Sequence, residues 1–139
     1  MKGSCLCGAV AFEVDKIPES YRACHCTACR KSGGHYWSAF SVANDDFRFT
    51  EDRGLKWYRS SDWAERGFCK VCGGNLFYHM LKEDRYMMAV GAFDDQSGFE
   101  LQRQVFIDEK PGFYDLAPLN MTSTGDDFFT RYPALKGKG

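Results

Sequence analysis

The chain has 139 residues, of which 44% are hydrophobic and 16% aromatic, and its formal net charge at pH 7 is −1. With a pI of about 6.3 and no stripe of lysine and arginine, it lacks the pattern typical of nucleic-acid-binding proteins. No apolar run approaches the length of a membrane span, so neither nucleic acid nor a membrane is an expected partner. This length fits one domain, which we assign to residues 1–139, with an ordered part of about 3–132.

Short segments that are apolar, β-branched or alternating follow one another along the chain and predict strands. They cover residues 9–14, 36–42, 47–50, 55–59, 64–68, 75–80, 86–90 and 103–108. The segment 27–31 is expected to form a short helix, which Gly33 and Gly34 would end.

The part of the chain after about Tyr114 shows no clear periodicity, and we expect it to be irregular, with residues 136–139 disordered. The aspartate pairs at 94–95 and 126–127 are typical of turns. The predicted fold class is therefore all-β or β-rich, a small domain of short antiparallel strands stapled by metal.

Seven cysteines fall into three tight clusters: Cys5 and Cys7; Cys24, Cys26 and Cys29; Cys69 and Cys72. An odd number at CxC and CxxC spacing indicates thiolates on metal rather than disulfides. The alternatives, a disulfide framework or buried free thiols, are disfavoured because CxC neighbours bridge poorly and such spacing rarely arises from packing. The N-terminus enters the first cluster without the apolar segment of a signal peptide, so we expect a cytoplasmic location.

Glycine follows the last cysteine in two of the clusters, as Gly8 after Cys7 and Gly73 after Cys72. A zinc knuckle needs a sharp turn whose amides point at sulfur, and glycine permits that backbone. We therefore pair these two clusters as one zinc site, with the ligands Cys5, Cys7, Cys69 and Cys72. Four ligands close a tetrahedral site, so this zinc is expected to be structural.

The third cluster places three thiols on one short loop, where they can grip a single metal locally. Its members are Cys24, Cys26 and Cys29. The fourth ligand is left open between His25, His35, His79, water and a substrate. His25 lies between two ligands and should point away from them. His35 could reach the metal sterically, and His79 lies in a predicted strand. Because three protein ligands leave a position for substrate, we predict that this zinc is catalytic.

The charge of such a site decides its chemistry. A zinc with three thiolates carries a net charge of −1, which makes it a poor activator of water, but it suits sulfur. An incoming thiol would lose its proton at neutral pH, and the thiolate can attack a carbonyl to form a C–S bond, or the reverse reaction can cleave one. The donor set therefore favours thiol activation over hydrolysis.

Aromatic residues near the third cluster and several cationic residues are candidates for a substrate pocket. The aromatic candidates are Tyr36, Trp37 and Phe40, for which core packing is the alternative. The cationic candidates are Arg22, Arg30, Lys31 and Arg59, which can either hold substrate carboxylates or lie on the solvated surface.

Segments 3–10, 24–33 and 68–74, with all seven cysteines in order, resemble the glutathione-dependent formaldehyde-activating enzyme family, also named for centromere protein V. Segment 105–114 resembles that family's C-terminal strand and turn, so the resemblance covers about residues 3–115. It implies a β-tent fold with two zincs. It assigns the structural metal to Cys5, Cys7, Cys69 and Cys72, and the catalytic metal to Cys24, Cys26 and Cys29. The implied activity is the formation of S-(hydroxymethyl)glutathione from glutathione and formaldehyde, a carbon–sulfur lyase class.

The sequence thus predicts a zinc-dependent enzyme of the carbon–sulfur lyase type with two zincs per chain. It would activate a small thiol, glutathione, for addition to, or release from, a small aldehyde such as formaldehyde. The alternative is a non-catalytic interaction module with two structural zincs, which a histidine on the third cluster would favour. A third interpretation is a redox or metal-buffer protein whose three-thiol site releases zinc on oxidation.

Overall fold

The computed structural model describes residues 1–16, 20–116 and 121–137. Its strands are β1 Lys2–Ser4, β2 Ala11–Val14, β3 Ser20–Cys24, β4 Trp37–Ala43, β5 Phe47–Glu51, β6 Leu55–Arg59, β7 Ala64–Cys69, β8 Asn75–Met80, β9 Arg85–Ala89, β10 Glu100–Val105 and β11 Thr122–Ser123. Its helices are α1 Thr27–Gly33 and α2 Gly125–Arg131, with 3-10 turns η1 Asn44–Asp46, η2 Val90–Ala92, η3 Ile107–Glu109 and η4 Pro133–Leu135. Within these ranges no helix has the length and apolar character that a membrane crossing requires.

The strands form two sheets. Over the described residues, β1, β2 and β5 make a three-stranded antiparallel sheet, and the other eight strands make a second sheet in the order β11-β10-β3-β4-β9-β8-β7-β6. The β-rich class is therefore confirmed. The expectation of antiparallel strands alone needs a correction, because β10 pairs in parallel with both β3 and β11. A parallel pair needs a long crossover, and the whole segment from β4 to β9 separates β3 from β10.

Most strands lie where alternation of the side chains predicted them. Strands β6 and β8 occupy the predicted ranges, Leu55–Arg59 and Asn75–Met80. Strand β10 begins at Glu100 rather than at residue 103, and it ends at Val105 rather than at residue 108, because the chain then leaves the sheet and enters η3. Helix α1 also lies where it was predicted, and it ends with Gly34 in the left-handed conformation, at φ 80°.

The region expected to be irregular contains helix α2, so that prediction is wrong. A capping box starts the helix: the amide of Asp127 donates to Thr124 Oγ1 at 3.0 Å, and the amide of Thr124 donates to Asp127 Oδ2 at 2.7 Å. The aspartate pair expected in a turn, Asp126 and Asp127, therefore occupies the first helical turn, where negative charge is favourable. Of the tail expected to be disordered, residues 138–139 lie outside the described residues, and residues 136–137 follow η4.

The hydrophobic core lies between the two sheets. The largest fully buried side chains include Phe12 from the small sheet and Phe40, Phe77 and Met88 from the large one. The strand register places Phe40 and Phe77 on either side of Met88, and the ring of Phe12 meets that of Phe77 edge to face at 5.3 Å. Burying each of these side chains stabilises the fold by about 1.5–3 kcal/mol, so the core holds the two sheets together.

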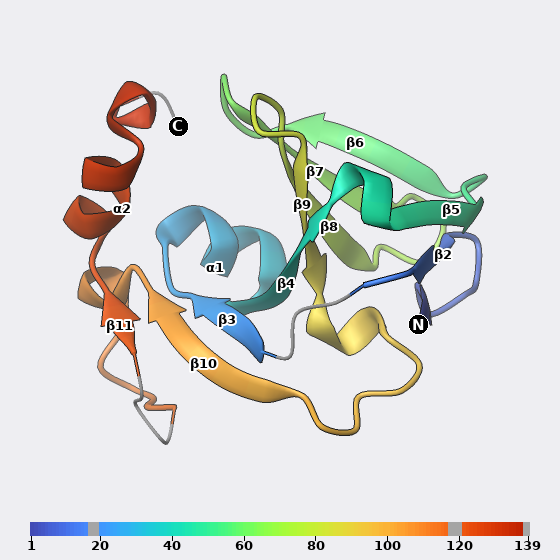
Figure 1. Cartoon of the computed structure of the whole chain (residues 1–139), viewed down its shortest axis with the longest axis horizontal. Coiled ribbons are helices and arrows are strands. Elements are labelled where there is room, and N and C mark those ends of the chain that lie inside the picture. Colours follow the sequence, from blue (N-terminus) through green and yellow to red (C-terminus); the bar gives the residue numbers. More distant parts are fainter. Residues whose placement is uncertain (17–19, 117–120, 138–139) are drawn as a thin grey trace.

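The opposite face of the large sheet carries the alternate residues of the same strands, because successive side chains in a strand point to opposite faces. Among them are Ala39, Tyr78 and Met87, which share a pocket with residues of α1 and α2. Figure 1 shows α2 at the end of the molecule farthest from the small sheet, with α1 between them. The core therefore uses one face of the large sheet and leaves the other for a site.

Candidate metal centres

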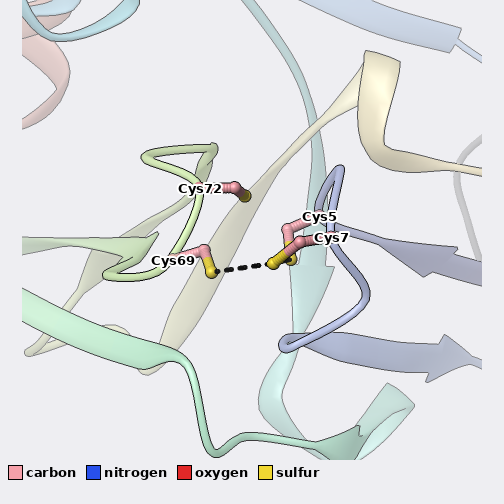
Figure 2. Close-up of side chains that lie close together, drawn as sticks. All are labelled: Cys5, Cys7, Cys69 and Cys72. Atoms are coloured by element: carbon pink, nitrogen blue, oxygen red, sulfur yellow. Dashed lines mark hydrogen bonds between the residues drawn. The ribbon is translucent and has the colours of Figure 1, made fainter.

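Four cysteines from two distant loops converge beside the small sheet. Cys5 and Cys7 come from the loop between β1 and β2, and Cys69 and Cys72 come from the end of β7 and the turn that follows it. Figure 2 shows the four sulfur atoms pointing toward one another. All lie within 4.8 Å of each other, with Cys5 and Cys7 sulfurs 3.7 Å apart and Cys7 and Cys69 sulfurs 3.8 Å apart. Sulfurs held tetrahedrally at about 2.3 Å from zinc lie about 3.8 Å apart, so this group fits a closed zinc site.

The two loops have the backbone that the glycine placement predicted. Gly8 has φ 75° and Gly73 has φ 76°, and both values lie in the region that side-chain-bearing residues rarely adopt. The amide of Val10 approaches Cys5 Sγ at 3.3 Å. A Cβ atom on Gly54 would meet Cys69 Sγ at 2.9 Å, so this neighbouring loop also packs directly on the sulfur group.

The second group consists of Cys24, Cys26 and Cys29, whose sulfur atoms also lie within 4.8 Å of one another. Cys24 ends β3, Cys26 is the N-cap of α1, and Cys29 lies in its first turn. The cap fixes the loop, since the amide of Cys29 points at Cys26 Sγ over 3.4 Å. Over the described ranges, no histidine, aspartate or glutamate joins this group. The site therefore offers three protein ligands where the first offers four.

The three thiols perturb one another strongly. Contacts with the thiols of Cys24 and then Cys29 lower the pKa of Cys26 to about 2. The same contact with Cys26 raises the pKa of Cys24 well above its usual value. One thiolate is thus stabilised by two neighbouring thiols, an arrangement that a divalent metal would complete by displacing the remaining protons.

Arg66, which sequence reasoning did not select, supplies positive charge at this group. Its guanidinium nitrogens lie 3.8 and 3.9 Å from Cys29 Sγ, and one of them donates to Ser32 Oγ at 3.0 Å. The side chain is only 8% exposed and covers the ring of Tyr78 at 4.9 Å. The alternation of β7 was the signal that could have identified Arg66, because this residue shares a strand face with the buried Ala64.

His25 turns away from the thiols between which it lies in sequence. It is fully buried, with Nε2 2.8 Å from Gln104 Oε1 and Nδ1 2.5 Å from the Tyr114 hydroxyl. Burial lowers its pKa, so the ring is neutral at pH 7. The expectation that adjacent residues of this loop point in different directions is confirmed, and His25 anchors the loop to the region of β10.

The other two histidines also have partners outside the three-thiol group. His79 lies between Glu65 and Asp84, with ring nitrogens 3.0 Å from each carboxylate. His35 is exposed and packs its ring on that of Tyr114 at 4.3 Å. None of the candidate histidines therefore occupies the fourth position of this site.

A cavity of about 320 Å³ opens beside the three thiols. Of the aromatic candidates, Trp37 lines it, Phe40 is buried in the core and Tyr36 stacks near His35 and Tyr114. Of the cationic candidates, Arg22 lines the cavity, Arg30 and Arg59 donate to backbone carbonyls, and Lys31 lies at a second, smaller hollow. The structure thus brings one aromatic and one cationic candidate to the site.

Similarity to known proteins extends over most of the chain. The model of the family described as glutathione-dependent formaldehyde-activating enzyme matches residues 1–109. An uncharacterized lyase of Schizosaccharomyces pombe is 31% identical over 127 residues, which span 91% of this chain and 92% of the relative. A crystal structure of a Rhodobacter sphaeroides protein superposes with a TM-score of 0.59 at 28% identity, covering 68% of this chain and 88% of that one. The chain belongs to the glutathione-dependent formaldehyde-activating enzyme family.

Proposed function

We propose that this protein is a zinc-dependent enzyme of the carbon–sulfur lyase type. It activates a small thiol, glutathione, for addition to, or release from, a small aldehyde. The observation that carries the proposal is the difference between the two sulfur groups: one gathers four cysteines, and the other gathers three beside a cavity of about 320 Å³. Free cysteine thiols are typical of a reducing compartment, so we propose that the protein is cytoplasmic.

Both groups fit zinc by their chemistry, since sulfur-only sets of this spacing match its preferred ligands. We assign a structural zinc to Cys5, Cys7, Cys69 and Cys72, and a catalytic zinc to Cys24, Cys26 and Cys29. With three thiolates and one exchangeable position, the catalytic metal would supply acidity to a substrate thiol, making its sulfur nucleophilic at neutral pH.

Arg66 offsets the negative charge that collects at this site. Three ligand thiolates and one substrate thiolate carry more negative charge than a divalent cation neutralises. The buried guanidinium, 3.8 Å from Cys29 Sγ, reduces the cost of holding that charge away from water. Its contact with Ser32 and its position over Tyr78 fix it in place, so the charge is preorganised.

Four arginines, of which Arg22 lines the cavity, are candidates for binding the carboxylates of glutathione. Arg22 lines the cavity and pairs across the parallel strands with Arg103. Partial burial and the charges of Arg103, Arg131 and Arg85 lower the pKa of Arg22. None of the four forms an ion pair with another described residue. Arginine binds carboxylates through paired hydrogen bonds, so this group can orient the thiol substrate.

The test is the visible spectrum of the cobalt-substituted protein during a glutathione titration. We expect a new sulfur-to-cobalt band that grows and saturates, because the three-thiol site has a position for a fourth sulfur. The Cys26→Ser variant, loaded only at the four-cysteine site, is the control and should give no such band. An unchanged spectrum in the wild type would contradict the proposal.

A further inference from the structure

The cavity beside the three thiols is lined mainly by apolar side chains. Its aromatic and aliphatic members include Trp37, Trp63, Tyr78, Met87, Phe128 and Leu135. The thiols and Arg66 supply the reactive polar groups, and the remaining polar lining consists of Arg22, Thr27, Ser60, Ser61 and Glu109. Apolar cavities with a few localised polar groups are typical of sites that bind a largely apolar ligand with one reactive or polar end.

A continuous wall leads from the thiols to helix α2. Arg66 contacts Cys29 and covers the ring of Tyr78 at 4.9 Å. The ring of Tyr78 meets that of Trp63 at 5.9 Å, and Trp63 in turn meets Phe128 of α2 at 6.2 Å. A molecule whose reactive carbon faces the thiols would therefore direct its remaining atoms along these rings.

Helix α2 is fixed in this position by specific contacts. The amide of Gly125 donates to Asp108 Oδ1 at 2.6 Å, and the ring of Phe128 packs on Phe106 at 5.2 Å. The capping box at Thr124 stabilises its first turn. This helix and η4 follow residue 109, where the match to the family model ends, so Phe128, Phe129 and Leu135 of the apolar lining come from a part of the chain beyond that match.

The size of the cavity exceeds what formaldehyde needs. A volume of about 320 Å³ lies at the lower end of the range of about 300–1,000 Å³ that is typical of small-molecule sites. Formaldehyde has two heavy atoms and would contact little of the apolar wall, and the polar peptide of glutathione, which we direct toward Arg22, also matches that wall poorly. An alkyl or aryl group on the carbonyl carbon would displace water from the wall and bury apolar surface.

We propose that the apolar cavity between the three thiols and α2 binds the alkyl or aryl group of the carbonyl substrate, so that the preferred aldehyde is larger than formaldehyde. This inference rests on the proposed function. The thiolate sulfur forms a C–S bond to the carbonyl carbon, the π electron pair moves to the oxygen, and the oxygen takes up a proton. Thiol and aldehyde thus add without loss of any atom, and the reverse reaction releases both.

The first experiment measures the rate of hemithioacetal formation with glutathione above the uncatalysed rate, for the zinc-loaded full chain and straight-chain aldehydes from formaldehyde to hexanal. We expect kcat/KM to rise by about fourfold for each methylene that enters the cavity. In Phe128→Ala the ratio of the hexanal to the formaldehyde value should fall at least tenfold. Phe113→Ala, an exposed aromatic outside this cavity, is the matched control and should keep the wild-type ratio.

The second experiment separates the cavity from the reaction by using the corresponding unreactive alcohols, from methanol to hexanol, with benzyl alcohol as the aryl probe. Binding is followed by tryptophan fluorescence, because Trp37 and Trp63 line the cavity. Affinity should increase with chain length in the wild type and lose that dependence in Phe128→Ala. If alcohols show this dependence while no aldehyde reacts, the proposed function fails and the apolar site stands. If aldehydes react but neither rate nor affinity depends on chain length, the apolar site is refuted and the proposed function stands.

Discussion

Replacing Arg66 with methionine tests the charge balance of the three-thiol group. Methionine keeps an unbranched apolar stem against Tyr78 but removes the guanidinium that lies 3.8 Å from Cys29 Sγ. The buried thiolates would then have lost a neighbouring positive charge. We expect the second zinc to bind more weakly and the fold to remain.

The magnitude follows from the contact distance. Two unit charges 3.8 Å apart attract by about 4 kcal/mol at an effective dielectric constant of about 20. Part of this attraction is offset by the free-energy cost of burying Arg66. The net contribution of a hydrogen bond to a charged group is about 1.5–3 kcal/mol. The expected loss of zinc affinity is therefore about 10- to 100-fold, the range typical of residues that contact metal ligands.

The assay is zinc competition with a chromophoric chelator, in which the four-cysteine site serves as the internal standard. Arg66→Lys keeps one charge and should recover part of the affinity. Arg48→Met removes an arginine that pairs on the surface with Glu13 and Asp15, and it should leave both zinc affinities unchanged. If Arg66→Met holds the second zinc within about twofold of the wild type, the role assigned to Arg66 is refuted.

Three further predictions concern the metal ligands, the helix cap and the thiol substrate. Cys26→Ser should lose one of two zincs and all activity while keeping its circular dichroism spectrum, whereas Cys69→Ser should unfold, because it leaves the structural metal short of a ligand. Thr124→Ala should lower the free energy of unfolding, measured by chemical denaturation, by about 1 kcal/mol and should lower the ratio of the hexanal to the formaldehyde kcat/KM. Thr130→Ala on the same helix is the control. Equal effects of the two substitutions would contradict the capping role. Arg22→Met should raise KM for glutathione by up to about fivefold. KM for β-mercaptoethanol, which has no carboxylate, should stay unchanged. Equal changes of KM for both thiols would exclude a carboxylate contact.

Spacing and alternation predicted those parts of the molecule that depend on local patterns. The cysteines converge in the two groups that glycine placement indicated, because Gly8 and Gly73 adopt the backbone that such loops need. That these groups hold zinc stays a prediction. Strands β6 and β8 were found at their predicted bounds, since each is a short run of aromatic and aliphatic residues bounded by turn residues.

The parts that sequence reasoning missed depend on contacts between distant segments. Strand β3 carries few apolar residues and gains its place from β4 on one side and the parallel strand β10 on the other. Helix α2 is too short for a periodic signal, although the Thr124 and Asp127 spacing of a capping box was readable. Arg66 was not selected: the alternation of β7 could have indicated its burial, but its sequence neighbours do not show that Cys29 of α1 lies against it.

The separation of the four-cysteine ligands along the chain has a consequence for synthesis on the ribosome. Cys7 and Cys69 are 62 residues apart, whereas Cys26 and Cys29 are 3 apart. Closing the longer loop costs about 2–3 kcal/mol more in chain entropy. During translation the local three-thiol loop is complete before the partner ligands of Cys5 and Cys7 have been made. A nascent chain that binds both proposed zincs would therefore bind the one at the three thiols first, and its N-terminal thiols would have to stay reduced until β7 has been made.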